Sequence, residues 1–299
     1  FALIGLGYSA AITRFFSAEA TAYLTKFVFY FALSAMLFRF SSDLSLSELY
    51  DPEFIYAYLS ASLIIYFLAT AVAIFRKKVP SEAAVEAQCS VIGNVGFLGI
   101  PMLAILMGPK SVGFIMIILA IDLIVFGSLI VLIIVASKDK KLDLFLFYRV
   151  LLGLMKNPMI VSIICGLLWS ASGWSIPGPI NDFIVMLGSA ATPGALFAIG
   201  ASLAQKSTER FEVAAWLSFC KLVLHPLAVC IAVFFIFEVE IYAATVMIAA
   251  ASLPVAGNIF MVAHHYNVAP KRASAAIFLS TVLSVFTVSF TIAWVSSFN

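Results

Sequence analysis

The chain has 299 residues, of which 64% are hydrophobic and 11% charged, with a formal net charge of +2. Soluble domains of this size contain about 45–50% apolar residues, so the composition excludes a water-soluble protein and predicts an integral membrane protein. The net charge gives no indication of nucleic-acid binding. The four cysteines lie in apolar runs without a CxxC spacing or a Cys/His cluster, so neither a disulfide framework nor a metal site is predicted.

Runs of mostly apolar residues, separated by charged residues or by Pro and Gly, predict ten membrane helices in an all-α fold. A helix needs about 20 apolar residues to cross a bilayer. The expected helices lie near residues 1–13, 20–38, 53–75, 84–107, 111–136, 158–172, 180–204, 213–236, 240–264 and 273–296. Because the sequence does not begin with Met, we expect the short first helix to extend further. Its composition does not match a signal peptide.

The segment between the fifth and sixth helices, residues 137–157, is first basic and then amphipathic, which predicts an interfacial helix on the cytoplasmic side. Lys and Arg residues number 13 in the connections after odd-numbered helices and 2 in those after even-numbered helices. Because Lys and Arg favour the cytoplasmic side, both termini are expected outside the cytoplasm. The expected location is the plasma membrane, which is the inner membrane in a bacterium.

Short similar strings recur in the same order at an offset of about 160 residues. The pairs are SAMLF (34–38) with PGALF (193–197), YLS (58–60) with WLS (216–218), PK (109–110) with PK (270–271), and LIVF (123–126) with LSVF (283–286). Together they predict a duplicated five-helix unit, with repeats at 1–136 and 158–299. Because five is odd, the second repeat must be inverted in the membrane, as in many secondary transporters, although a channel or a scaffold protein could share this symmetry.

The fourth helix of each expected repeat contains helix-breaking and polar residues in mid-span. These are NVGFLGIPMLAILMG (94–108) and SLPVAGNIF (252–260), and the 161-residue offset places Gly93-Asn94 on Pro254-Val255. A broken helix leaves N–H and C=O groups unpaired, which a bilayer tolerates only where protein covers them or where they line a polar cavity. The N-termini of half-helices have a partial positive charge and free N–H donors. Two such breaks predict a site for a small anion, especially a carboxylate.

The candidate substrate-binding residues follow from these breaks. They are Gly93, Asn94, Val95, Pro254, Val255 and Asn258, with Gln88, Ser34, Pro193 and Gly194 as further candidates. The asparagine amides can donate to an oxygen or accept from a substrate N–H or O–H. The alternative is that the glycines and prolines only permit kinks and close helix packing. The same alternative applies to Ser34 and Pro193-Gly194, which occupy matching places in the second and seventh helices.

Ionisable residues inside membrane helices are expensive and are candidates for function. Asp122 lies about 16 Å into the fifth helix at 1.5 Å per residue, and Lys221 lies in the eighth. His225 follows Lys221 on the same helical face. We expect Asp122 and Lys221 to form a buried pair that couples proton or ion movement to transport. A static, structural ion pair is the alternative.

The strings GNVGFLGIPMLAILMG (93–108), ATPGALFAIGASL (191–203) and SLPVAGNIFMVAHHYNVAP (252–270) resemble the auxin efflux carrier family of bacterial and plant transporters. The resemblance covers nearly the whole chain. It implies the fold of sodium/proton antiporters and bile-acid transporters, with helices four and nine crossing at the substrate site. It also implies a scaffold of helices 1, 2, 6 and 7 and a transport domain of helices 3–5 and 8–10.

The family moves small organic anions, including dicarboxylates and, in plants, indole-3-acetate. This chain departs from the family pattern at Gly93 and Ser34, where related sequences often have proline. It also lacks the long hydrophilic centre of many plant carriers, which indicates a bacterial-type or other short member.

We therefore expect a secondary active or facilitative transporter of a small organic anion, such as malonate, malate or an auxin-like acid, working by elevator-type alternating access. The alternative is a cation/proton antiporter that uses Asp122. A membrane sensor or intramembrane enzyme is least supported, because the sequence has no HExxH, no paired catalytic aspartates and no Ser/His set. No metal or organic cofactor is implied. Proton or sodium coupling and a homodimer are compatible with the sequence.

Overall fold

The computed structural model describes residues 2–43, 51–138, 152, 155, 158–204 and 211–298. Within these ranges the secondary structure is helical, apart from one isolated antiparallel bridge between Gly93 and Val255. The expected interfacial helix at 137–157 lies outside the described residues except at four positions. The membrane-embedded, all-helical class predicted from composition agrees with these elements.

The first half of the chain contains eleven described elements, among which η1, η2 and η3 are single π-helical turns. They are α1 (Ala2–Ile12), α2 (Ala18–Phe27), η1 (Val28–Ala32), α3 (Leu33–Ser42), α5 (Pro52–Phe75), α6 (Pro80–Val91), η2 (Val95–Gly99), α7 (Ile100–Met107), α8 (Ser111–Ile121), η3 (Asp122–Phe126) and α9 (Gly127–Lys138). Local sequence explains where they begin. For example, the Asp51 carboxylate accepts from the Phe54 N–H at 3.1 Å and Pro52 occupies the first turn of α5, a favourable helix start.

The second half of the chain is also helical, with π turns at η4 and η5. Its described elements are α11 (Pro158–Ser172), α12 (Gly178–Ser189), α13 (Ala191–Leu203), α14 (Phe211–Phe219), η4 (Cys220–Leu224), α15 (His225–Ile231), η5 (Ala232–Ile236), α16 (Ile241–Ala251), α17 (Gly257–His265), α18 (Pro270–Val295) and the short 3-10 turn η6 (Ser296–Phe298). Each expected helix corresponds to these elements within about four residues at its ends.

Within the described ranges, five continuous helical segments are long and apolar enough to cross a membrane. They are Ala18–Ser42, Pro52–Phe75, Ser111–Ile134, Phe211–Ile236 and Pro270–Val295. Shorter apolar helices, including Ala2–Ile12, Val95–Met107 and Ile241–Ala251, accompany them. The chain is therefore a multi-pass membrane protein.

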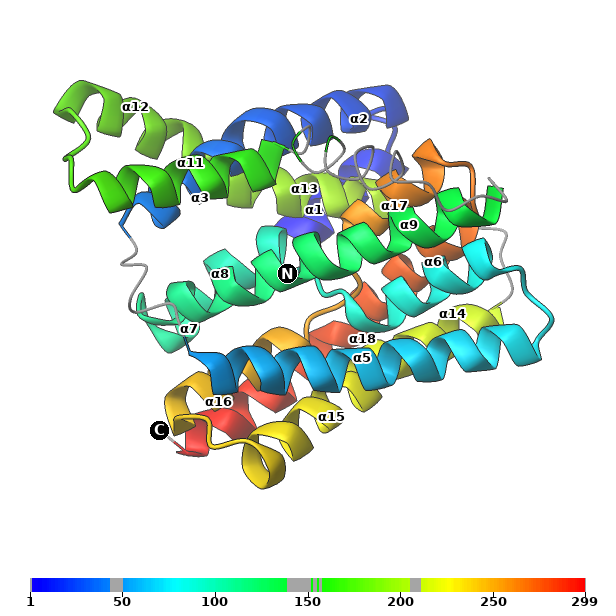
Figure 1. Ribbon diagram of the computed structural model, residues 1–299. Coiled ribbons are helices and arrows are strands. Elements are labelled where there is room, and N and C mark those ends of the chain that lie inside the picture. Colours follow the sequence, from blue (N-terminus) through cyan, green and yellow to red (C-terminus); the bar gives the residue numbers. More distant parts are fainter. Residues whose placement is uncertain are drawn as a thin grey trace. The chain divides into compact units, whose positions relative to one another are not determined.

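The chain divides into two compact units. The first contains Phe1–Tyr50, Gly96–Pro101 and Gly153–Lys206, and the second contains Asp51–Val95, Met102–Leu152 and Ser207–Asn299. In the first unit α1 packs on α13, and α11 lies beside α3 (Figure 1). These backbones approach closely because glycine faces the partner helix. A Cβ on Gly7 would collide with the Phe197 carbonyl, and one on Gly200 with the Ile4 carbonyl, which is the small-residue packing typical of membrane helices.

The second unit contains α6, α16, α17 and the non-helical residues that follow α6 and α16, whereas Gly96–Pro101 belongs to the first unit. In the second unit α5 packs on α6 and α15, α14 packs on α18, and α16 packs on α8 (Figure 1). The interior is filled by large side chains such as Tyr58, Tyr66 and Phe126. By contrast, all nine residues from Ala243 to Ala251 in α16 are buried, and five of them are alanine. The five alanines allow neighbouring helices to approach α16 closely.

Candidate functional site

The two interrupted helices meet where each of them stops. α6 ends at Val91, and the backbone is non-helical until η2 begins. Likewise α16 ends at Ala251, and the backbone is non-helical until α17 begins. Gly93 pairs with Val255 in an antiparallel bridge. The Asn94 N–H donates to the Pro254 carbonyl at 2.7 Å, and the Ala256 N–H donates to the Ile92 carbonyl at 3.1 Å. We call this paired segment, residues 92–94 and 254–256, the crossing. It brings Gly93, Asn94, Pro254 and Val255 together.

Several peptide groups that we expected to be free are paired at the crossing. Besides the two hydrogen bonds between the breaks, the Val255 N–H donates to the Ser280 hydroxyl of α18 at 3.1 Å. The expectation that these particular groups are free to bind an anion is therefore wrong. The physical reason is the cost of several kcal/mol for each unpaired peptide group in an apolar medium, which the two breaks reduce by pairing with each other.

Three polar side chains lie in the crossing or beside it. Asn94 is buried, and the side-chain oxygens of Gln88 and Asn258 are buried without a hydrogen-bond partner among the described residues. Gln88 lies one turn before Ile92, whose N–H donates to the Gln88 carbonyl at 2.9 Å. Asn258 is the second residue of α17. Buried amide oxygens without a partner are rare in folded proteins, and these two are suited to accept from a substrate N–H or O–H.

Lys221 extends from η4 to the crossing and is fully buried. Its ammonium donates to the carbonyl of Ala251, the last residue of α16. A Cβ built on Gly93 would lie 3.3 Å from the Lys221 Cε and 3.4 Å from its Nζ. Because a helix C-terminus has a partial negative charge, the end of α16 stabilises the ammonium. The Lys221 amine is thus buried directly against the crossing.

Replacing Gly93 by Val is expected to lower the free energy of unfolding by about 1–3 kcal/mol, the usual cost of overpacking. The added side chain would meet Lys221 and the Ala250 carbonyl, which lies 3.4 Å from a Cβ at this position. Thermal unfolding of the purified protein in detergent measures the effect. Gly257→Ala is the control, because a Cβ there has nothing within 4 Å. Equal melting temperatures for the two variants would contradict the tight packing of the crossing.

Asp122 is buried at the start of the π turn η3. Its Oδ1 accepts from the Tyr58 hydroxyl at 2.8 Å, and its Oδ2 has no hydrogen-bond partner in the described part of the chain. The direct Asp122–Lys221 ion pair that we expected is absent from the ion pairs between described residues. Each group instead contacts a different partner, since α5 presents a phenol to the carboxylate and Lys221 reaches the end of α16.

His225 follows Lys221 by one turn, and its Nδ1 lies 3.1 Å from the Lys221 Nζ. Its Nε2 lies 3.0 Å from the Ser62 hydroxyl of α5, and its ring packs edge-on against Tyr58 at 5.8 Å between centroids. The sequence interpretation missed Tyr58 and Ser62. Their signal was two hydroxyls four residues apart on one helical face, but such residues are common in membrane helices and did not stand out.

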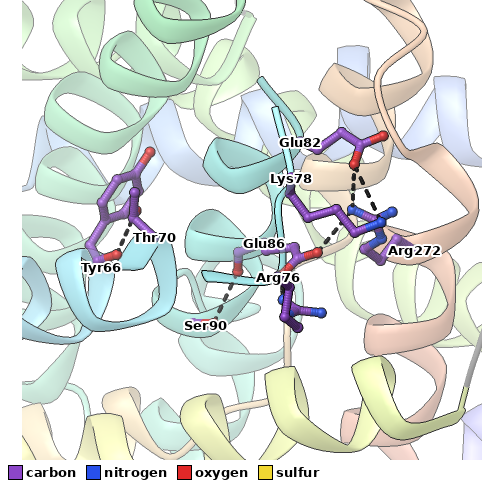
Figure 2. Close-up of polar contacts among 8 residues, drawn as sticks. All are labelled: Tyr66, Thr70, Arg76, Lys78, Glu82, Glu86, Ser90 and Arg272. Atoms are coloured by element: carbon purple, nitrogen blue, oxygen red, sulfur yellow. Dashed lines mark hydrogen bonds and ion pairs between the residues drawn. The ribbon is translucent and has the colours of Figure 1, made fainter. Parts of the chain in front are cut away.

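A second buried polar cluster joins α6 to the first turn of α18 (Figure 2). Glu86 is fully buried and accepts from Arg76 and from Arg272, whose Nη1 lies 2.9 Å from the Glu86 Oε1. The same Arg272 nitrogen lies 3.3 Å from Glu82, which also faces Lys78 at 3.9 Å. The sequence interpretation missed Glu86, although it is an ionisable residue inside the expected helix 84–107.

The remaining candidates, Ser34, Pro193 and Gly194, belong to the first unit. The Ser34 hydroxyl donates to the Phe29 carbonyl at 3.2 Å. A Cβ on Gly194 would lie 2.6 Å from the Val28 side chain, and Pro193 is exposed. These contacts agree with the close-packing alternative stated for this group.

Comparison with known proteins agrees with a transport site. The family model described as "Membrane transport protein" matches residues 1–292. A protein of Rhizobium meliloti (strain 1021), described as a proposed malonate transporter, is 28% identical over 292 residues, which cover 97% of this chain and 91% of that protein. Family and relative are transporters, so the expectation that the chain is not an enzyme is confirmed, as is the resemblance noted from its motifs. The chain belongs to the family of membrane transport proteins that includes the auxin efflux carriers.

Proposed function

We propose that the protein carries a small organic anion across the plasma membrane by secondary active or facilitative transport, and that the anion binds at the crossing. The single observation that supports this most is the Lys221 ammonium, buried against two interrupted membrane helices. A buried positive charge without a carboxylate in direct contact attracts an anion strongly, because the surroundings screen it little. The family of transporters supplies the reaction class.

A carboxylate is the anion that this site suits best. In the proposed arrangement Lys221 balances its charge, while the Asn94 and Asn258 amides donate to its oxygens. The backbone beside these amides, at Val95, Pro254 and Val255, is proposed to form the wall of the site. The Gln88 oxygen accepts from a hydroxyl or a protonated carboxyl. Malonate, malate and an auxin-like acid all fit this description, and the relative named for malonate transport makes malonate the first to test.

Movement is proposed to follow the elevator scheme, with the second unit as the transport domain and the first as the scaffold. The division into two compact units, with α5, α8, α14 and α18 in the unit that contains the crossing, supports this assignment. Two inverted repeats, 1–136 and 158–299, account for the matching breaks in α6–α7 and α16–α17. Both termini are proposed to lie outside the cytoplasm, which the distribution of Lys and Arg supports.

Asn94→Ala and Asn258→Ala are each expected to weaken malonate binding about 10- to 150-fold. This corresponds to about 1.5–3 kcal/mol for one hydrogen bond to a charged group. Uptake of labelled malonate into proteoliposomes and thermal stabilisation of the purified protein by malonate measure the effect. Thr70→Ala is the control, because the hydrogen bond that its hydroxyl makes among the described residues goes to the Tyr66 carbonyl of its own helix, at 2.8 Å. The proposal fails if malonate, malate, indole-3-acetate and related acids neither enter the vesicles nor stabilise the protein.

A cation/proton antiporter is the second candidate function. It is favoured by one observation, the Asp122 Oδ2, which is buried and lacks a hydrogen-bond partner among the described residues. An unpartnered carboxylate oxygen is suited to bind a proton or a small cation. Sodium-dependent proton movement in proteoliposomes without any organic anion would favour this function over the carrier.

A further inference from the structure

A series of buried polar side chains lies between Asp122 and Lys221. The Tyr58 hydroxyl lies 2.8 Å from the Asp122 Oδ1. Ser62 stands one turn further along α5, and the Tyr58 and Ser62 side chains interact. The Ser62 hydroxyl lies 3.0 Å from the His225 Nε2, and the His225 Nδ1 lies 3.1 Å from the Lys221 Nζ. None of the five side chains is more than 2% exposed.

The donors along this series all point in one direction when Lys221 is an ammonium and Asp122 a carboxylate. An ammonium can only donate, so it donates to the His225 Nδ1, which leaves the N–H on Nε2. That N–H donates to Ser62. The interaction of Ser62 with Tyr58 then directs the Ser62 hydroxyl toward the Tyr58 oxygen, and the Tyr58 hydroxyl donates to the carboxylate. Each group between the ammonium and the carboxylate therefore both receives and donates a proton, which is the requirement for proton transfer along such a series.

Shifting every proton by one place converts the charged pair into a neutral pair. The ammonium loses one proton to Nδ1, the Nε2 proton passes to Ser62, the Ser62 proton passes to Tyr58, and the Tyr58 proton passes to the carboxylate. The result is a neutral Lys221 amine, a neutral Asp122 carboxyl and the other His225 tautomer. One proton has moved in total, and no oxidant, reductant or solvent proton is consumed.

We propose that Tyr58 and Ser62, with His225, form a proton relay between Asp122 and Lys221 that couples anion binding at the crossing to proton movement. This inference rests on the proposed function, because it requires an anion bound at the crossing to change the protonation of Lys221. The bound anion favours the ammonium form of Lys221. When Asp122 also binds one further proton, which comes from water on one side of the membrane, the pair has one net positive charge, which balances one carboxylate.

The neighbouring charged residues do not provide an alternative route among the side chains described. Glu86 on α6 and Arg272 on α18 are paired with each other, and Arg76 is paired with Glu86. Lys221 makes its remaining hydrogen bond to the Ala251 carbonyl. The titratable groups in contact with Asp122 and Lys221 are thus Tyr58 and His225, and Ser62 is the group that joins them.

The experiment compares Tyr58→Phe and Ser62→Ala with matched variants on the same helix. Tyr66→Phe removes a phenol that is equally buried but has no hydrogen-bond partner among the described residues. Ser60→Ala removes a hydroxyl that bonds only the Ala57 carbonyl, at 3.2 Å. Proteoliposomes with a trapped pH dye are given labelled malonate with and without an inward proton gradient. Malonate exchange at equal concentrations on both sides is measured in parallel.

We expect Tyr58→Phe and Ser62→Ala to retain malonate exchange and thermal stabilisation by malonate. Gradient-driven uptake and the accompanying proton movement should fall about tenfold or more, as expected when a positioned proton-transfer group is removed. Tyr66→Phe and Ser60→Ala should resemble the wild type. A merely structural role for the hydroxyls would lower exchange and thermal stability together, and this result would overturn the relay.

The outcomes separate the relay from the proposed function. Malonate uptake without proton movement in the wild type overturns the relay and leaves the carrier. Proton movement that is equal in the wild type, Tyr58→Phe and Ser62→Ala also overturns the relay. Proton movement without uptake of any carboxylate overturns the carrier, and its loss in the two relay variants would still support the relay. A wild-type protein that moves neither overturns both.

Discussion

Replacing Lys221 by Met is expected to lower malonate transport about a hundredfold or more, in exchange as well as in net uptake. Met keeps the length and flexibility of the side chain and removes its charge, so the crossing loses the positive charge that is proposed to hold the anion. Truncating one partner of a buried charge pair commonly costs 2–5 kcal/mol of binding free energy. Uptake of labelled malonate over a range of concentrations measures the loss.

The stability of this variant is expected to change in a different way from its transport. Removing a buried charge is favourable in itself, whereas leaving the Ala251 carbonyl without its donor is unfavourable. The two effects oppose each other, so the melting temperature should shift by only a few degrees. Lys110→Met is the control, because the Lys110 side chain is 69% exposed and lies 4.0 Å from Glu240. Wild-type uptake by Lys221→Met would show that another group holds the anion.

Replacing Glu86 by Gln is expected to cause the largest loss of stability of any single substitution proposed. The neutral amide leaves the Arg272 and Arg76 guanidinium groups without their buried partner. Breaking a buried ion pair in this way costs about 3–5 kcal/mol, which corresponds to a fall in melting temperature on the order of 10 °C. Thermal unfolding in detergent, followed by tryptophan fluorescence at a fixed scan rate, measures the change.

Glu82→Gln provides the matched comparison on the same helix. The Glu82 side chain is 32% exposed, and it faces the same Arg272 as well as Lys78. Partly exposed ion pairs contribute about 0–1 kcal/mol, so this variant should melt within a few degrees of the wild type. Equal losses for Glu82→Gln and Glu86→Gln would contradict the view that burial of Glu86 makes the cluster strong.

The helices and their interruptions could be predicted well from the sequence. Apolar run length fixes membrane helices closely, and the Pro, Gly and Asn residues in two matching helices located both breaks. The pairing between the two breaks could not be predicted from the sequence. That Gly93 would pair with Val255 depends on the way in which two distant segments approach, which no local pattern contains.

The polar groups of the second unit were predicted only in part. Asp122, Lys221 and His225 were recognisable because a charge in an apolar helix is rare. Tyr58 and Ser62 were missed because such hydroxyls are common in membrane helices. Their role becomes visible only in the structure, where α5 contacts Asp122 of η3 and His225 of α15. The expected direct ion pair was wrong for the same reason, since a hydroxyl-bearing helix supplies the partners.

The two main-chain hydrogen bonds of the crossing have a mechanical consequence. They join a break in the first half of the chain to a break in the second, and Lys221 fastens the end of α16 beside them. Separating the two breaks would leave several peptide groups without hydrogen-bond partners in an apolar medium. Moving both breaks together would keep the two main-chain hydrogen bonds intact. If the crossing moves during the proposed transport, these hydrogen bonds favour movement of residues 92–94 and 254–256 together rather than apart.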